Sequence, residues 1–469
     1  MYDEFLTLCG FEPEEIEKES PRIEKAFKIL ELTPEDVEQA RGRLLKWDLE
    51  LMGVRKFLGI GIKQLVAGAL AREEYDKIVY INGQALSQVA EAVMESTPDV
   101  FMAAPELPFM FVHGAVFGED KTNLLLEAAE ENGLRPGQAH CGIYQLWIGA
   151  LAKGYVPKPD LIYSMGSANC SQNSEADYLA QEVFGIPVTY PDTVDYPYGD
   201  RWPQVSARRL QYVGESMRLA QQKIDDLVGI TTTDEMKKKA LISSGMTFQP
   251  LLSIPEFLKK DPPPISLVEL QYAYYISAMP LLPELRQEAI KAARLLEKEV
   301  KARAEAGFGI VEKGTPRIFF PVFQAVTPTL CFMLKEMGLI PVAEIALCLT
   351  QYDKHPPQIK TVEERIEEGL YRKAMWNRGN GIPNYFSEIS REWNVDGAVA
   401  AATYNCRMMH PPMMIAKDVL EKDLGIPVLR LELDIYDTRT FTLEQIRTRL
   451  ETFAGVVKAA KKAKAAKEA

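Results

Sequence analysis

Short apolar runs alternate with longer amphipathic stretches along most of the chain, and this alternation constrains the fold more than any other feature. Several runs are rich in β-branched residues, and several end in glycine or asparagine or are followed by proline. They lie at residues 76–83, 99–104, 160–166, 186–190, 316–323, 340–347, 396–405 and 426–434. Apolar runs of this length, separated by stretches of helical periodicity, are typical of parallel α/β units. The sequence therefore predicts an α/β protein with two Rossmann-like parallel-sheet lobes.

The regions outside the two series are predicted to be helical. Two Ser/Thr-Pro signals, Ser20-Pro21 and Thr33-Pro34, are typical of helix starts because proline is tolerated in the first turn. No internal sequence repeat is obvious. We predict five parts: a helical N-terminal segment (1–75), a first α/β lobe (76–200), a helical connector (201–310), a second α/β lobe (311–457) and a basic tail (458–469) that frays.

The composition is that of a globular protein. The chain has 469 residues, of which 47% are hydrophobic and 26% charged, so more than one domain is expected. Its formal charge of −12 argues against nucleic acid or an anionic membrane as the main partner. No run approaches the ~18 consecutive apolar residues of a membrane span. The acidic N-terminus lacks the features of a signal peptide, so we predict a cytoplasmic protein.

Three of the six cysteines stand at similar corners of the predicted fold. Cys170 and Cys406 each follow a predicted strand and precede a predicted helix, and Cys141 opens a helix after a loop. Ligands bind at the carboxyl ends of parallel strands, and a helix N-terminus favours the thiolate that ligates metals. Three thiolates suit a cubane iron–sulfur cluster with one open iron better than structural zinc, which takes four protein ligands. The alternative is three unrelated buried thiols.

The other three cysteines are predicted to be buried small residues and not ligands. Cys331 lies inside a predicted helix, Cys348 lies within or beside a predicted strand, and Cys9 is near the N-terminus.

The residues around Cys141, Cys170 and Cys406 resemble a known family. The matching stretches are CGIYQLWIGALAKGYVPKPDLIYSMGSANC (141–170), YLAQEVFGIPV, WNVDGAVAAATYNC and DLGIPVLRLELDIYD, with PELPFMFVHG (105–114) as an upstream landmark. They are similar to the D-component of 2-hydroxyacyl-CoA dehydratases and to related subunits of ATP-dependent benzoyl-CoA reductases. The resemblance covers about residues 100–457.

This resemblance implies that Cys141, Cys170 and Cys406 bind one [4Fe-4S] cluster in the cleft between the lobes. It also implies a homologous second subunit and a separate ATP-hydrolysing iron–sulfur activator, which delivers single electrons of low potential. The chain itself has no GxxxxGK[ST] motif, so ATP use is expected in the partner. An electron added to a CoA thioester carbonyl gives a ketyl radical anion, from which elimination or ring reduction becomes accessible.

Of these reactions we expect dehydration of a 2-hydroxyacyl-CoA to a 2-enoyl-CoA. One alternative is a subunit of a benzoyl-CoA-type reductase that acts on an aryl-CoA. Another is a non-catalytic electron-relay subunit of such a complex. A third is a two-lobed module that binds a small molecule and whose cysteines are incidental.

Three residues are predicted to contact the substrate. Glu106 and His113 belong to the landmark, which we expect to be a loop; Glu106 is either a general base or an exposed loop carboxylate. His410 follows the third cysteine in CRMMHPPMM, where many family members have a shorter Cys-x-Pro-Tyr-like stretch. The catalytic residues are not assigned by the resemblance.

Overall fold

The structure is a computed structural model that describes residues 2–47, 49–82, 87–134, 140–165, 171–192, 206–321, 328–345, 347–348, 361–366, 382–402, 406, 410–434 and 436–468. Its contacts divide the chain into two compact units. Unit 1 comprises Met1–Pro250, Tyr272–Leu296 and Pro356–Leu370, and unit 2 comprises Leu251–Gln271, Glu297–His355 and Tyr371–Ala469. The five-part division predicted from the sequence stays a prediction.

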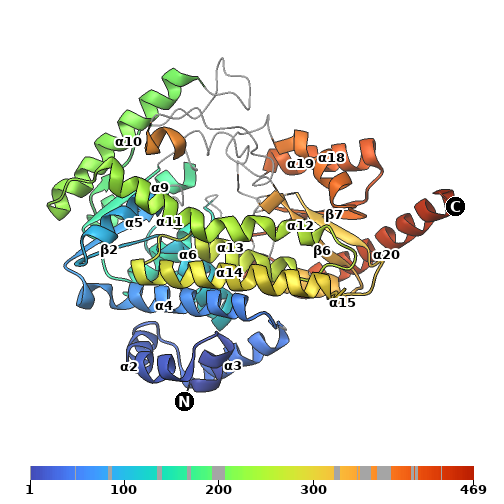
Figure 1. The fold of residues 1–469 in the computed structure, drawn as a ribbon, viewed down its shortest axis with the longest axis horizontal. Coiled ribbons are helices and arrows are strands. Elements are labelled where there is room, and N and C mark those ends of the chain that lie inside the picture. Colours follow the sequence, from blue (N-terminus) through green and yellow to red (C-terminus); the bar gives the residue numbers. More distant parts are fainter. Residues whose placement is uncertain are drawn as a thin grey trace. The chain divides into compact units, whose positions relative to one another are not determined.

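Helices make up most of the described chain (Figure 1). They are α1 (Asp3–Leu8), α2 (Pro13–Ile29), α3 (Pro34–Lys46), α4 (Met52–Glu74), α5 (Ser87–Ser96), α6 (Glu106–Pro108), η2 (Phe109–Phe117), α7 (Glu119–Glu131), α8 (Gly142–Ala152), α9 (Ser171–Phe184), α10 (Ala207–Val228), α11 (Asp234–Ser253), α12 (Pro255–Leu258), α13 (Leu267–Ala278), α14 (Pro283–Glu305), α15 (Pro328–Glu336), α18 (Ile382–Glu392), α19 (His410–Asp418), η4 (Val419–Asp423), η5 (Thr438–Thr440) and α20 (Leu443–Glu468). The elements η2 and η4 are π-helices, and η5 is a 3-10 helix.

In the described part of the chain, eight strands form two four-stranded parallel sheets, one in each unit, which confirms the predicted α/β class. The strands are β1 (Lys77–Asn82), β2 (Val100–Ala103), β3 (Leu161–Ser164), β4 (Val188–Thr189), β5 (Arg317–Phe320), β6 (Ile340–Glu344), β7 (Gly397–Ala402) and β8 (Val428–Glu432). Each of the eight apolar runs contains one strand. The sheet orders are β2-β1-β3-β4 and β6-β5-β7-β8, so the order reverses between β1 and β3 and between β5 and β7.

The two sheets also agree in detail at the amino ends of their strands. In unit 1 the N–H of Ile78 donates to Asp160 Oδ2 at 2.8 Å, and the N–H of Asp160 donates to the Ile78 carbonyl at 2.8 Å. In unit 2 the N–H of Arg317 donates to Asp396 Oδ2 at 2.9 Å, and the N–H of Asp396 donates to the Arg317 carbonyl at 2.8 Å. Asp160 and Asp396 therefore occupy equivalent positions before β3 and β7.

A short sequence repeat becomes visible once the sheets are compared. Gly-Ile-Pro-Val occurs at 185–188 before β4 and at 425–428 before β8. The two glycines have φ of +60° and +65°, a region that glycine enters more readily than other residues. We found no repeat from the sequence alone because the shared residues are few and far apart.

The two Ser/Thr-Pro signals of the N-terminal helices have different outcomes. Thr33 is the N-cap of α3, and its Oγ1 accepts a hydrogen bond from the N–H of Asp36 at 3.2 Å, as predicted. Ser20-Pro21 lies inside α2, so the predicted helix start there is wrong. The helix begins earlier, at Pro13, where Glu12 and Glu15 form a capping box.

The landmark 105–114 is also helical, not a loop as we predicted. Pro105 precedes α6, and the apolar sequence Phe109–Phe117 continues as the π-helix η2. Most of η2 is buried because it packs against α3, α4, α7 and α8. Uniform apolarity conceals helical periodicity, and burial on several sides is the physical reason for it.

One buried arginine joins several elements in each unit. In unit 1 Arg286 forms an ion pair with Glu91, and its two terminal nitrogens donate to the carbonyls of Ser277 and Met279 at 3.0 Å. In unit 2 the guanidinium of Arg317 donates to three backbone carbonyls, those of Leu258, Lys260 and Trp393.

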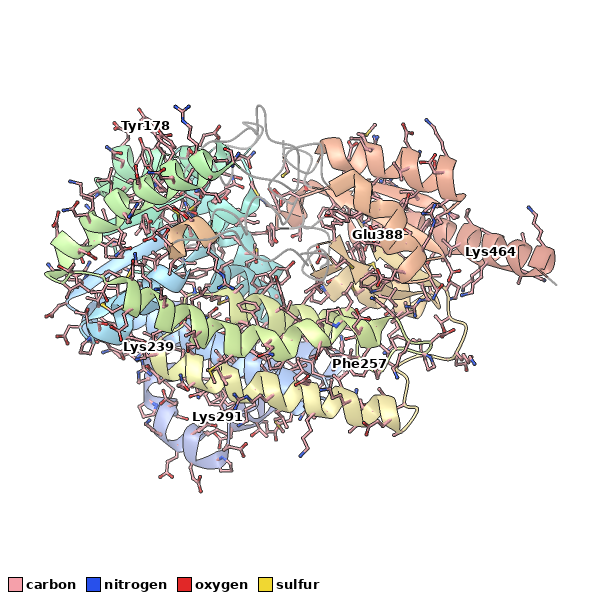
Figure 2. The ribbon with its side chains drawn as sticks, turned by 45° about the horizontal axis from the view of Figure 1, so that its top comes forward. Tyr178, Lys239, Phe257, Lys291, Glu388 and Lys464 are labelled. Atoms are coloured by element: carbon pink, nitrogen blue, oxygen red, sulfur yellow. The ribbon has the colours of Figure 1, made fainter. Side chains whose placement is uncertain are left out.

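The basic end of the chain continues helix α20 as far as Glu468. Figure 2 shows the part of α20 around Lys464 extending beyond the sheet of unit 2. Among the described helices, none combines the length and the hydropathy that a membrane-spanning helix requires.

Candidate functional site

The carboxyl ends of β1 and β3 meet where the strand order of the first sheet reverses. Asn82, the last residue of β1, pairs in register with Ser164, the last residue of β3. Both side chains are buried. In open α/β sheets this edge, outside the carboxyl ends at the switch point, is where ligands bind.

Asp177 on α9 connects these two strand ends. Its Oδ1 accepts from Asn82 Nδ2 at 2.8 Å, and its Oδ2 accepts from Ser164 Oγ at 2.5 Å. Asn173, one turn earlier on α9, donates through Nδ2 to Ser164 Oγ at 3.0 Å. All four side chains are buried, whereas Tyr178 beside Asp177 is 65% exposed and points outward (Figure 2). Helix α9 thus places one face on the sheet edge and another in solvent.

Glu106 contributes a second carboxyl group to this edge. It stands on α6, three residues after the end of β2, and is only 5% exposed, so the alternative of an exposed loop carboxylate is wrong. The pKa of Glu106 is raised to about 8, mainly by burial and to a smaller extent by the negative charge of Asp177, while a hydrogen bond from its own backbone N–H lowers it. Its Oε2 is buried and has no hydrogen-bond partner within the described residues. Glu106 therefore holds a proton at neutral pH.

The pKa of Asp177 is raised less. Burial raises it to about 6, while the hydrogen bonds from Ser164 and Asn82 lower it. At neutral pH Asp177 is therefore ionised while Glu106 is neutral. A pair of carboxyl groups whose pKa values are separated in this way is a frequent arrangement in sites of proton transfer.

Cys141 lies at the start of a helix, as predicted. It is the N-cap residue of α8, with extended backbone angles, and its side chain is buried. The backbone N–H groups of Tyr144 and Gln145 donate to its carbonyl at 3.0 and 3.2 Å. These bonds fix the backbone of Cys141 at the N-terminus of α8, a position where the helix dipole favours a thiolate.

Cys170 and Cys406 follow equivalent strands at the same spacing. Cys170 lies outside the described residues; it comes six residues after Ser164, and α9 begins at the next residue, Ser171. Counting from the equivalent aspartates Asp160 and Asp396, the position of Ser164 corresponds to Ala400, and Cys406 follows Ala400 by six residues. Cys406 is buried, and α19 begins shortly after it at His410.

The remaining cysteines lie in apolar surroundings. Cys9, Cys331 and Cys348 are buried, and burial raises the pKa of each thiol above its ordinary value. For Cys348 the negative charge of Glu344 adds to this effect. Such thiols stay protonated, as expected for structural cysteines.

His113 lies among aromatic rings. Its ring centroid is 5.3 Å from that of Phe109 and 6.0 Å from that of Tyr155, and the side chain is fully buried. Burial lowers its pKa to about 3, so it is neutral. His410 is the first residue of α19. The predicted contacts of both histidines with substrate stay predictions.

Sequence reasoning missed Asn82, Ser164, Asn173 and Asp177. Their only signal was position, since polar residues stood at the ends of two predicted apolar runs and in the helix that follows the second run. Within the residues that the structure describes, no group of three or more His, Cys, Asp or Glu side chains is placed to hold a metal ion. The predicted set Cys141, Cys170 and Cys406 includes a cysteine outside those residues.

Comparison with known proteins agrees with the resemblance found in the sequence. Residues 99–456 match the family model of the 2-hydroxyglutaryl-CoA dehydratase D-component. The chain is also 21% identical over 337 residues to the (R)-phenyllactyl-CoA dehydratase alpha subunit of Clostridium sporogenes, covering 70% of this chain and 78% of that protein. Both matches support a component of a 2-hydroxyacyl-CoA dehydratase.

Proposed function

Because the chain belongs to the 2-hydroxyglutaryl-CoA dehydratase D-component family, we propose that it is the iron–sulfur subunit of a complex that dehydrates a 2-hydroxyacyl-CoA to a 2-enoyl-CoA. The observation that carries the proposal is the extent of the match: residues 99–456 include all three predicted ligand cysteines, the strands β2 to β8 and Glu106. The printed name of the Clostridium relative, an alpha subunit of an acyl-CoA dehydratase, supports the same reaction class.

The proposed cofactor is one [4Fe-4S] cluster held by Cys141, Cys170 and Cys406. The donor chemistry fits, since iron–sulfur clusters are held by thiolates and Cys141 is buried at a helix N-terminus. Cys406 is buried beyond the carboxyl end of β7. When bound, the cluster supplies single electrons of low potential and an open iron.

The residues of unit 1 supply the proton chemistry in this proposal. Glu106 is a neutral carboxylic acid at neutral pH, so it can donate a proton to the hydroxyl group that leaves. The apolar residues around it, Ala103 and Ala104, are buried and keep the local dielectric low. We also keep His113 and His410 as proposed substrate contacts.

The proposal includes two protein partners. One is a homologous second subunit, since the Clostridium relative is named as one subunit of its enzyme. The other is a separate ATP-hydrolysing iron–sulfur activator that delivers the electrons. An obligate contact with the second subunit is expected to bury roughly 2,000 Å² or more.

Iron and sulfide analysis tests the cofactor. The complex is purified anaerobically with Cys141, Cys170 or Cys406 replaced singly by serine, and Cys331→Ser serves as the matched control because it changes a buried cysteine inside α15. We expect each of the three variants to lose most of its cluster absorption and iron, and the control to keep both. A full complement of iron in Cys170→Ser contradicts the ligand assignment.

Turnover tests the reaction class. The complete complex is assayed anaerobically with activator, ATP, a reductant and a series of 2-hydroxyacyl-CoA and aryl-CoA thioesters. We expect a 2-enoyl-CoA product. Reduction of an aryl-CoA, without 2-enoyl-CoA from any hydroxyacyl substrate, assigns the chain to the reductase branch instead.

A further inference from the structure

The two carboxyl groups at the edge of the first sheet have unequal hydrogen-bond partners. Each oxygen of Asp177 accepts a hydrogen bond from a buried side chain, Asn82 on one side and Ser164 on the other. Glu106 differs: it accepts from its own backbone N–H, and its Oε2 is buried without a partner in the described part of the chain. A buried negative charge needs donors, so it is stabilised on Asp177 and not on Glu106.

The direction of the hydrogen bonds supports the same assignment. Asn173 Nδ2 donates to Ser164 Oγ at 3.0 Å, which leaves the hydroxyl proton of Ser164 directed at Asp177. The amide of Asn82 also presents a donor to Asp177. A protonated Asp177 would place its own O–H against one of these donors.

We propose that Glu106 and Asp177 act as an unequal pair, in which Asp177 stays ionised and its charge adds to the effect of burial in keeping Glu106 in the protonated form that the reaction uses. This inference rests on the proposed dehydration. Glu106 is the catalytic member, and Asp177 is a positioning residue that acts through it.

The proton balance of dehydration fits a single carboxyl group. The hydroxyl oxygen of the substrate keeps the electron pair of the breaking C–O bond. It takes the proton from Glu106 and leaves as water. The electron pair of the β C–H bond becomes the new double bond, and its proton returns to the Glu106 carboxylate. Glu106 is thereby restored, and no other proton donor is consumed.

Other elements packed against Glu106 add no opposing charge. Helices α4, α8 and η2 contact α6; α8 carries no charged residue, and η2 carries only His113, which is neutral. The described charged side chains of α4 engage partners elsewhere, such as Lys63 with Glu288 and Arg72 with Asp160. Among the described residues, the charge found to act on Glu106 is that of Asp177, and its effect is smaller than that of burial.

The test is an infrared titration of the full chain in its complex. The carbonyl stretch of a protonated carboxylic acid is followed with pH, and subtraction of the Glu106→Gln spectrum assigns the band. We expect Glu106 to be protonated at pH 7. In Asp177→Asn we expect the midpoint to fall by roughly one pH unit, because a like charge nearby is removed. Glu175→Gln, which removes an exposed charge from the same helix, is the control and should leave the midpoint unchanged.

Two results overturn the inference: no Glu106 band at pH 7 in the unmodified chain, or the same midpoint in Asp177→Asn. The first needs no Asp177 variant, so it holds even if Asp177→Asn does not fold. The readout is independent of the cofactor. If the Glu106 band is present but the protein has neither iron nor turnover, the proposed function is rejected and the carboxyl pair is not. If the complex turns over substrate but shows no Glu106 band, the carboxyl pair is rejected and the proposed function is not.

Discussion

The carboxyl edges of the two sheets share a backbone plan but differ in chemistry. Counting from Asp160 and Asp396, Ser164 of unit 1 corresponds to Ala400 of unit 2. Counting back eight residues from Gly185 and Gly425, Asp177 corresponds to Lys417, which is half-exposed. The hydrogen-bonded network of unit 1 therefore has no equivalent at these positions of unit 2, although each edge is followed by a cysteine at the same spacing.

This difference shows which features belong to the fold and which to one site. The aspartate before the strand and the Gly-Ile-Pro-Val turn occur in both units, as expected of residues that support the sheet. The buried carboxyl pair occurs in unit 1. We therefore expect substitutions of the shared features to destabilise the two units equally. Substitutions of Glu106 or Asp177 are expected to affect unit 1.

The largest expected effect concerns the two buried arginines. Arg286→Met leaves the buried carboxyl group of Glu91 without its cation, which costs about 3–5 kcal/mol of unfolding free energy near pH 8. The loss should be smaller at pH 5, since burial raises the pKa of Glu91 and it can take a proton.

Arg317→Met is the comparison variant, because Arg317 contacts backbone carbonyls that do not titrate. Its loss of stability should be similar at the two pH values. Denaturant unfolding of both variants at pH 5 and pH 8 checks this, and an equal pH dependence would contradict the role of Glu91.

The next effect concerns Glu106. Its pKa in the folded chain is about 8, above its ordinary value of 4.5, so the folded state binds more protons between these values. Its contribution to stability is therefore complete below about pH 4.5 and is lost as the pH rises towards 8. Relative to Glu106→Gln, the unmodified chain should lose on the order of 2–4 kcal/mol between pH 5 and pH 8. Parallel stability curves for the two proteins would rule this out.

A smaller and symmetric effect is expected at the strand starts. Asp160→Ala and Asp396→Ala each remove the acceptor of a backbone N–H, that of Ile78 or Arg317. Each change should cost about 2 kcal/mol, and the two losses should agree within about 1 kcal/mol. Unfolding free energies measure both, and a loss confined to one unit breaks the proposed equivalence.

The smallest effect is expected at the two glycines. Gly185→Ala and Gly425→Ala place a Cβ on residues with φ of +60° and +65°, which should cost about 1 kcal/mol each. Around Gly425 nothing lies within 4 Å of the added Cβ, so the cost there is conformational and not a clash. Gly455→Ala, at a helical glycine in α20 with open space, is the control and should be neutral or stabilising.

Much of the fold could be predicted from local sequence. Each apolar run that was predicted to be a strand contains one, because strands buried on both faces are apolar throughout. Thr33 was recognised as a helix cap because its signal is local. Ser20-Pro21 carried the same signal and was wrong, since Glu12 and Glu15 cap the helix two turns earlier. The landmark 105–114 was mistaken for a loop because its apolar residues face several neighbours at once.

The sequence by itself determined the strands and the family, and it predicts the three cysteines of the proposed cluster, since these depend on residues that are neighbours in the chain or match a known pattern. Only the tertiary structure decided that Glu106 is buried and that Asn82, Ser164 and Asp177 meet at one edge. These residues are separated by tens of positions in the sequence. Parallel pairing brings the ends of β1 and β3 together, and burial then changes the protonation of groups whose side chains are unremarkable in water.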